Sequence, residues 1–162
     1  MERNTPITNA KSVCSFQNCF DAGDEVVIEY NISPLSHDEG KDCTKMRMTR
    51  LEKKYVNSRW QAEKNIKIAE RALGKTDSSS IRTVLEVGCG VGVLASYLAK
   101  KYKWHVTGID LDPEQVERAR SDHAENEYLR FLETDATRLP FEEGAFDLIL
   151  SFDVLHHIPR WD

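Results

Sequence analysis

The residues best suited to bind a ligand lie in one short stretch, Glu86-Val87-Gly88-Cys89-Gly90-Val91-Gly92. An apolar, strand-like run precedes this stretch, and a helical pattern follows it. Glycines at such a junction let the backbone turn sharply and approach a ligand without a Cβ in the way. Glu86, placed ahead of the glycines, would repel a pyrophosphate and attract a cationic ligand. The stretch therefore predicts a ligand-binding loop that favours positive charge.

The glycine spacing argues against a dinucleotide cofactor. A nicotinamide or flavin loop has the pattern G-x-G-x-x-G, and its third glycine would fall on Val93 of this chain. A nicotinamide-dependent oxidoreductase is therefore the least favoured alternative, and it would leave Glu86 without a role.

The same stretch resembles a motif of a known family. Leu85 to Gly92 is similar to E-x-G-x-G-x-G, the first motif of the class I S-adenosylmethionine (SAM)-dependent methyltransferases, and the resemblance extends over about residues 82–159. It implies SAM as the cofactor and S-adenosylhomocysteine (SAH) as the product. The cofactor-binding residues that it implies in this loop are Glu86, Gly88, Cys89 and Gly90.

Two further motifs agree in order and spacing with this family. Gly108-Ile109-Asp110-Leu111-Asp112 follows the second expected strand, where an acidic side chain can accept hydrogen bonds from both ribose hydroxyls. Asp110 is the candidate for that role, with Leu111 beside it, whereas Asp112 is expected to cap the next helix. The third motif begins at Thr134, and its resemblance implies that Asp135 and the backbone amide of Ala136 recognise adenine.

The fourth motif, Phe146 to Ile158, includes the sequence Leu-His-His-Ile. The resemblance implies that Ser151 and Phe152 line the methionine end of the cofactor, largely through backbone and shape. His157, and less so His156, is a candidate general base, since an imidazole can deprotonate a nucleophile near neutral pH. A structural histidine is the favoured interpretation, because holding the reactants in line supplies much of the rate in this family.

Composition limits the other functions of the chain. The 162 residues carry a net charge of −5, and no apolar run is long enough to span a membrane. We expect a cytoplasmic protein with reduced cysteines, no metal site and no membrane partner. A small-molecule methyl acceptor is expected, and a nucleic acid is disfavoured.

Short β-rich runs alternate with helical patterns from Ile81 onward, which predicts an α/β fold with a parallel, Rossmann-like sheet. The expected strands are Thr83 to Val87, His105 to Ile109, Leu129 to Thr134 and Phe146 to Phe152. Helices are expected from Val93 to Lys101 and from Pro113, on the faces of the sheet. The resemblance implies that these four strands lie in the order 3-2-1-4 and that the family's strands 5–7 are absent.

Three segments are expected: 1–44, poorly defined apart from a short strand at 25–30; 45–80, a covering helix and linker; and 81–162, the SAM-binding half. The helix should bury Leu51, Tyr55, Ala62, Ile66, Ala69 and Leu73 and end at Gly74. Residues 45–75 hold ten basic and three acidic residues, a solvated face in the favoured interpretation and an RNA-binding surface in the alternative. By analogy with related enzymes, Tyr55 and Arg59 are hypothesised to touch the cofactor.

The missing strands predict an unpaired, apolar edge on the fourth strand. We expect a partner or a missing C-terminal segment to cover that edge. The sequence thus indicates a SAM-dependent methyltransferase of small molecules. The alternatives are a non-catalytic or partner-dependent SAM-binding module or fragment, and an RNA methyltransferase.

Overall fold

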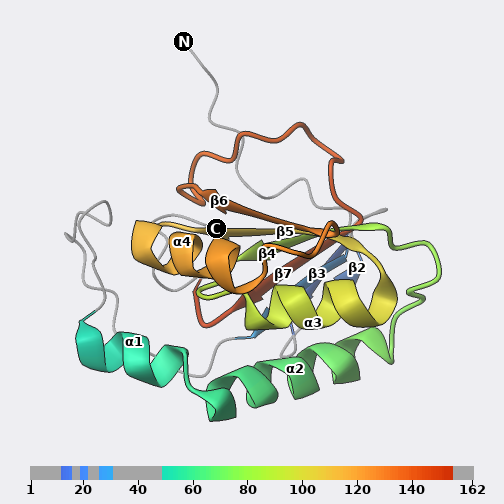
Figure 1. Cartoon of the computed structure of the whole chain (residues 1–162). Coiled ribbons are helices and arrows are strands. Elements are labelled where there is room, and N and C mark those ends of the chain that lie inside the picture. The colour runs from blue at the N-terminus through green and yellow to red at the C-terminus, as the bar shows by residue number, and fades with distance from the viewer. Residues whose placement is uncertain (1–11, 16–18, 22–25, 31–48, 155–162) are drawn as a thin grey trace.

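The structure is a computed structural model that describes residues 49–154 in full and the backbone of residues 12–15, 19–21 and 26–30. Four parallel strands form the centre of its sheet: β4 (Thr83–Val87), β5 (His105–Asp110), β6 (Leu129–Glu133) and β7 (Leu148–Phe152). They lie in the order β7-β4-β5-β6 (Figure 1). Read from β6, this is the predicted order 3-2-1-4, so the predicted fold class is confirmed.

The edge of β7 is not open, contrary to the expectation. β3 (Val26–Tyr30) pairs with it in parallel over its whole length, from Val26 opposite Leu148 to Tyr30 opposite Phe152. β1 (Ser12–Ser15) lies parallel to β3, and β2 (Cys19–Asp21) lies antiparallel to β1, which makes a seven-stranded sheet. The sequence indicated a strand at 25–30 but not its partner, because about 120 residues separate the paired strands and strand pairing has no local signal.

Three helices cover one face of the sheet (Figure 1): α2 (Arg59–Leu73), α3 (Val93–Tyr102) and α4 (Pro113–Asp122). α4 begins as predicted, with Pro113 in its first turn and the side chain of Asp112 accepting a hydrogen bond from the Glu114 amide. α3 begins directly at the glycine loop, where Gly92 is its N-cap. The helices therefore fix where the loops of the sheet edge point.

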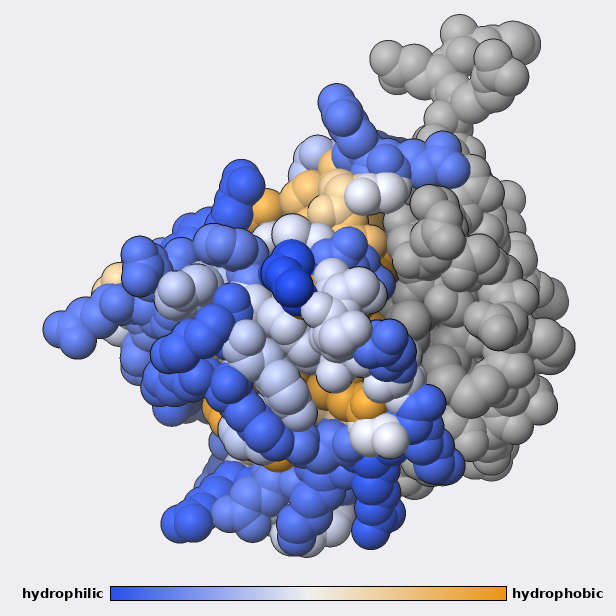
Figure 2. Space-filling view, turned by 90° about the vertical axis from the view of Figure 1, so that its right-hand side faces the viewer, coloured by the Kyte–Doolittle hydropathy of each residue, from blue (hydrophilic) through white to orange (hydrophobic). Residues whose placement is uncertain are grey.

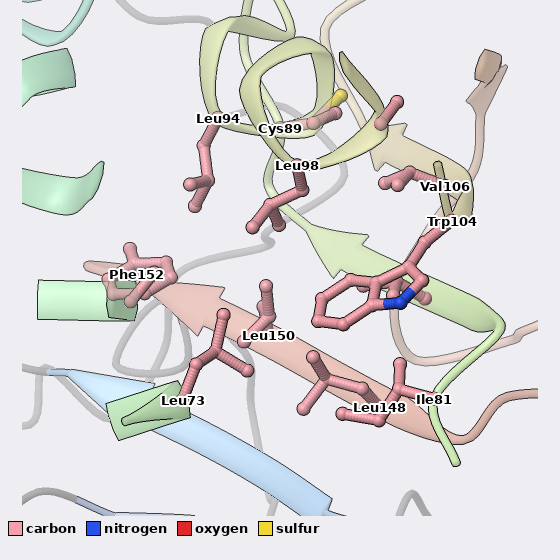
Figure 3. Close-up of a cluster of buried hydrophobic side chains, with 14 of the residues drawn as sticks. Leu73, Ile81, Cys89, Leu94, Leu98, Trp104, Val106, Leu148, Leu150 and Phe152 are labelled. Carbon is pink, nitrogen blue, oxygen red and sulfur yellow. The ribbon is translucent and has the colours of Figure 1, made fainter. Parts of the chain in front are cut away.

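Alternating residues of the strands form two cores. Val84, Leu148 and Leu150 face the helices and pack in a cluster with Leu98 and Leu73 (Figure 3). The neighbouring residues Leu85, Val87, Ile109 and Ile149 face the other side of the sheet, where residues of the 134–147 segment pack on them: Ala136, Leu139, Phe141 and Phe146. Both faces of β4 and β7 are thus buried, which explains their continuous apolar sequences.

The expected covering helix is two helices. α1 (Arg50–Val56) ends at Asn57, and Ser58 then caps α2 by accepting a hydrogen bond from the Gln61 amide. Serine and asparagine favour helix caps, so the chain breaks at this pair and the apolar face does not continue across it. The predicted burial of Leu51 and Tyr55 is wrong, since both are exposed, whereas that of Ala69 and Leu73 is confirmed, as is the end at Gly74.

Asp147 joins the starts of β4 and β7. Its Oδ2 accepts hydrogen bonds from the Arg82 amide at 2.8 Å and from the Thr83 amide at 2.9 Å. These bonds hold the pKa of the Asp147 carboxyl below its usual range, against the opposing effect of burial.

No helix in the described part of the chain is long and apolar enough to cross a membrane.

Candidate functional site

Four of the predicted binding segments meet at one edge of the sheet. β4, β5, β6 and β7 are parallel, so their carboxyl ends lie together. Backbone hydrogen bonds join the segments that follow them: the amides of Gly88 and Cys89 donate to the Ile109 carbonyl, and the Thr134 amide donates to the Asp110 carbonyl at 3.0 Å. We call this edge the rim. Open α/β sheets bind ligands at such an edge.

Packing requires two of the three glycines of the loop but not the third. Gly88 and Gly92 have positive φ angles of 73° and 75°, and a Cβ on either would collide with Val154 or Phe131, respectively. Gly90 also has a positive φ, 52°, but a Cβ there would meet only the Asn57 side chain, 3.6 Å away. Packing against the protein therefore requires glycine at 88 and 92, whereas at Gly90 the neighbouring atoms leave room for a Cβ.

Glu86 is buried at the end of β4, and its Oε2 has no hydrogen-bond partner. Burial raises the pKa of this carboxyl to about 8, with a smaller contribution from the negative charge of Asp110, while a hydrogen bond from the Ala95 backbone opposes the shift. Glu86 is therefore largely protonated at neutral pH when no cation is near. A cationic ligand would favour its ionised form, as the sequence suggested.

Asp110 ties the end of β5 to the glycine loop. Its Oδ2 accepts from the Gly90 amide at 2.8 Å and its Oδ1 from the Asp112 amide at 2.9 Å. Burial raises the pKa of Asp110, although these backbone bonds oppose the shift. The carboxylate is thereby oriented at the rim, and each oxygen retains a lone pair for a further donor. Leu111, next to it, is exposed.

The junction of α1 and α2 lies against the start of α4, beside the glycine loop. The Lys53 ammonium lies 2.7 Å from the Asp112 carboxylate and also contacts Glu114. The Asn57 side-chain amide donates to Gln115 of α4 at 3.0 Å, and the Asn57 Oδ1 is the atom that a Cβ on Gly90 would meet. Lys53 and Asn57 thus hold α1 at the start of α4, next to Gly90.

Asp135 and Ala136 lie just after β6, as predicted. The Asp135 Oδ1 accepts from the Thr137 amide and hydroxyl, both at 2.8 Å, which is an Asx-type turn. Ala136 packs on the core formed by Leu85 and Ile109. The turn is thus fixed on the rim with the Asp135 carboxylate half exposed.

Three predicted residues direct their side chains into the protein. Cys89 and Phe152 are buried in the core beneath the helices, and burial raises the pKa of the free Cys89 thiol. Ser151 is buried with its hydroxyl lacking a hydrogen-bond partner. Cys89 and Phe152 can therefore meet a ligand only through their backbone, whereas the Ser151 hydroxyl has unused hydrogen-bonding capacity.

Asp153 is a rim residue that the sequence analysis missed. It follows β7 with a φ of 57°, unusual for a residue with a side chain, and its Oδ2 accepts from the Gln61 side-chain amide at 3.0 Å. Lys64 lies 3.9 Å from the same oxygen. The sequence carried no local signal for this contact, because Gln61 and Asp153 are 92 positions apart.

Tyr55 is exposed beside Trp60, and Arg59 pairs with Glu63 one turn along α2. Their hypothesised contact with the cofactor stays a prediction. His156 and His157 lie outside the described residues. No group of three potential metal ligands occurs among the described residues.

Comparisons with known proteins agree on one family. Residues 84–162 match the family model described as a methyltransferase domain. The chain is 42% identical over 77 residues to 2-methyl-6-phytyl-1,4-hydroquinone methyltransferase of Synechocystis sp., covering 48% of this chain and 24% of that protein. It is 37% identical over 106 residues to the chloroplast tocopherol O-methyltransferase of Arabidopsis thaliana, covering 60% and 30%. The chain thus spans between about a quarter and a third of these relatives.

Solved structures are similar as well. One of them is the phosphoethanolamine N-methyltransferase 2 of Haemonchus contortus, in complex with phosphomonomethylethanolamine and SAH. The TM-score is 0.53 at 26% sequence identity, over 59% of this chain and 22% of that one.

Proposed function

We propose, from the premise that residues 84–162 belong to the methyltransferase domain family, that this chain binds SAM at the rim and serves the transfer of its methyl group to a small molecule. The observation that carries the proposal is the arrangement of the glycine loop. Gly90 has room beside it and its amide is bonded to Asp110, and the neighbouring Glu86 carboxyl has an Oε2 without a hydrogen-bond partner.

The residues at the rim fit SAM by their chemistry. SAM carries a sulfonium and an ammonium group, two ribose hydroxyls and an adenine. Glu86 offers an acceptor that a cation would ionise, and Asp110 offers oriented carboxylate oxygens that suit vicinal hydroxyls. The partly exposed Asp135 carboxylate suits the exocyclic amine of adenine.

We assign the residues accordingly. Asp110 would hold the ribose, with Leu111 beside it; Asp135 and the amide of Ala136 would hold the adenine. Gly88, Cys89 and Gly90 would contribute backbone at the loop. Glu86 and Ser151, with the backbone of Phe152, would face the methionine end. Support comes from the carboxyl ends of four parallel strands at which all of these residues lie.

The reaction needs little from the protein beyond the positioning of the cofactor and the acceptor. SAM, when bound, supplies an electrophilic methyl carbon attached to sulfur. Glu86, Asp110 and Asp135 would fix the cofactor by charge and hydrogen bonds, which leaves proximity and alignment of the acceptor as the main source of rate. His157 stays a candidate for removing the acceptor's proton.

A small acceptor is the favoured substrate class. Relatives that match this chain are named for a phytyl hydroquinone, for tocopherol and for the amine ajmaline, so both oxygen and nitrogen nucleophiles occur among them. The alternative is a SAM-binding module that needs a further segment or partner for catalysis, since the chain spans only part of each relative. The basic residues of 45–75 leave an RNA substrate as the third candidate.

We further propose the division of the chain into residues 1–44, a cover at 45–80 and a cofactor half at 81–162. The contacts of Lys53 and Asn57 with the loop region support the covering role of the second segment. A cytoplasmic location is proposed as well, and the unpaired, buried thiol of Cys89 is consistent with a reducing compartment.

Calorimetric titration of the full chain with SAM, SAH and NADH tests the cofactor. We expect binding of SAM and SAH but not NADH, and a loss of about 10-fold or more in SAM affinity for Asp110→Asn, as expected for a charged hydrogen-bonding partner. Asp122→Asn, the same change at an exposed site on α4, is the matched control and should bind normally. Binding of NADH instead of SAM would refute the proposal.

Methyl transfer needs its own test, because binding alone would also fit a module. SAH formation is measured with phenolic, amine and carboxylic acceptors. Turnover with any of them supports the enzyme, whereas tight SAM binding without turnover favours the module. Turnover that requires RNA would favour the third candidate.

A further inference from the structure

We propose that the outward surface of α1 and the start of α2 docks on the face of an anionic phospholipid bilayer. The surface is formed by Leu51, Tyr55, Val56 and Trp60, which we call the α1 patch. Four of the six exposed large hydrophobic residues in the described part of the chain belong to it. Leu51 is 80% exposed and Trp60 60% exposed.

The apolar side chains of the patch form one surface. Leu51 and Tyr55 are one turn apart on α1, and the rings of Tyr55 and Trp60 lie 6.3 Å apart across the helix break. α1 buries no residue at all, so these side chains contribute nothing to the core. A contiguous exposed apolar patch of this kind commonly marks a contact surface.

The charge around the patch is positive. Residues 50–73 contain seven Lys or Arg and three Glu. All three acids have partners within the chain: Glu52 accepts from the Thr49 amide, Glu63 from Arg59, and Glu70 from Lys101 and Tyr102. Three of the seven basic residues are paired with acids as well, Lys53 with Asp112 and Glu114, Arg59 with Glu63, and Lys64 with Asp153. The positive charge around the patch therefore comes from the other four, all of them exposed, Arg50, Lys54, Lys67 and Arg71, although the chain as a whole has a net charge of −5.

A recess beside Trp60 adds a place for an anion. It has a volume of about 320 Å³ and is open to solvent. Its lining combines an aromatic wall with basic side chains: Trp60, Glu63, Lys64, Lys67, Ile68 and Arg71. Lys67 and Arg71 are exposed, so they can meet a phosphate group that approaches from outside.

This combination fits a bilayer better than an RNA. Basic side chains suit the phosphates of either partner, but Leu51 and Val56 gain nothing from a sugar-phosphate backbone. At a bilayer surface, apolar side chains enter the boundary of the acyl chains while Trp, Tyr, Lys and Arg lie at the headgroups. The sequence predicted no membrane partner because it holds no apolar run long enough to span a bilayer, a criterion that does not detect a surface that docks on one.

The opposite side of the molecule has a different character. Figure 2 shows the side that lies away from α1, and its described surface is mainly hydrophilic, with small apolar areas between charged side chains. Since Lys53 and Asn57 hold α1 beside the glycine loop, docking through the patch would bring the rim close to the bilayer.

The test uses the full chain and vesicles of equal parts phosphatidylcholine and phosphatidylglycerol. Trp60 is exposed and Trp104 buried, and the third tryptophan, Trp161, is replaced by Phe for the emission measurement. Insertion of the patch should then shift the tryptophan emission to shorter wavelength, and the protein should sediment together with the vesicles. The double variant Leu51→Ser/Tyr55→Ser should bind at least about 10-fold more weakly and still fold, because neither side chain is buried.

Charge variants provide the matched comparison. Lys67→Glu/Arg71→Glu should lose binding, whereas Lys100→Glu/Arg130→Glu, the same charge change on exposed residues elsewhere, should retain it. Binding should fall as salt is raised. Equal binding to pure phosphatidylcholine vesicles would overturn the anionic part of the proposal.

Other outcomes would overturn the proposal as a whole. These are no binding to the anionic vesicles at low salt, or unchanged binding by the Leu51→Ser/Tyr55→Ser variant. Sedimentation of the free protein as a dimer that this variant abolishes would assign the patch to a second copy. Retention of a single-stranded RNA that depends on Lys67 and Arg71, without vesicle binding, would assign it to RNA.

Discussion

At the scale of residues, two carboxyl groups near the glycine loop are in different states. Asp110 is held by two backbone amides, while Glu86 is buried without a partner for Oε2. Glu86 is thus destabilising in the absence of a ligand and suited to compensate a positive charge when one arrives. Sites that bind ligands often retain such a cost to stability.

Replacing Glu86 tests this difference. The wild-type carboxyl has its pKa raised to about 8, so between about pH 4.5 and pH 8 it takes up a proton when the chain folds. The free energy of unfolding of the wild type therefore falls as the pH rises from about 4.5 to 8. Glu86→Gln lacks this titration and should be more stable at pH 7 by up to roughly 3 kcal/mol. Urea unfolding at pH 5 and pH 8 measures the gap, which should widen with pH. A gap independent of pH would contradict the assignment.

The glycines provide a second prediction at this scale. Gly88→Ala places a Cβ within 2.1 Å of Val154 and should cost more than about 2 kcal/mol of unfolding free energy. Gly90→Ala meets no such collision and should cost about 1 kcal/mol through its positive φ. Its main effect should be on SAM affinity, measured by calorimetry. Equal destabilisation by the two variants would contradict the proposed division of roles.

At the scale of elements, the contacts that hold α1 within the described part of the chain are mainly polar. It has a capping box at Thr49 and Glu52, the Lys53 contacts with Asp112 and Glu114, and no buried side chain. Hydrogen bonds with these carboxylates raise the pKa of Lys53, and Lys53 in turn lowers that of Asp112 against the effect of burial. A helix of seven residues is not stable in isolation, so its position depends on these contacts.

Removing the Lys53 charge should therefore release α1. Lys53→Met is expected to speed amide exchange in residues 50–56 while α3 and the sheet keep their protection. Lys54→Met, the neighbouring and exposed lysine, is the matched control and should leave exchange unchanged. Wild-type exchange in α1 should also rise in acid, as Asp112 is protonated below its usual pKa range. If Lys53→Met and Lys54→Met behave alike, the ion pair does not hold α1.

At the scale of the whole molecule, the sheet is completed by residues distant in sequence. β3 pairs with β7 along its full length and lies between β7 and β1. The apolar β7 is thus central rather than an edge, and the pairing protects its backbone from association with other chains. The order of the sheet is therefore a property of residues 12–30 together with 83–152.

A proline in β3 tests this pairing. Ile28 lies opposite Leu150 of β7 and Cys14 of β1, so Ile28→Pro removes a ladder hydrogen bond whichever neighbour its amide serves. We expect faster amide exchange in residues 148–152 and concentration-dependent association in sedimentation. Ile28→Val keeps the amide and should behave like the wild type. Unchanged exchange in β7 would show that β3 is not needed to cover it.

The sequence by itself determined the local features of this protein. Apolar runs predicted the four strands between Thr83 and Phe152, and capping residues predicted the start of α4 at Asp112 and Pro113. Glycine spacing and strand ends predicted that Glu86, Asp110 and Asp135 lie on the rim. These signals act within a few residues of the chain, so they can be read without the fold. The family itself was recognised from the same motifs.

Only the tertiary structure decided which distant segments meet. The pairing of β3 with β7, the contact of Lys53 with Asp112, and the bond between Gln61 and Asp153 join residues about 60 to 120 positions apart. The break at Asn57 and Ser58 rotated Leu51 and Tyr55 from the expected core to the surface, because a cap that is satisfied locally changes the register of every residue before it. Long-range pairing depends on the packed whole and has no local pattern, whereas the break between the two helices has a local signal in the capping residues Asn57 and Ser58.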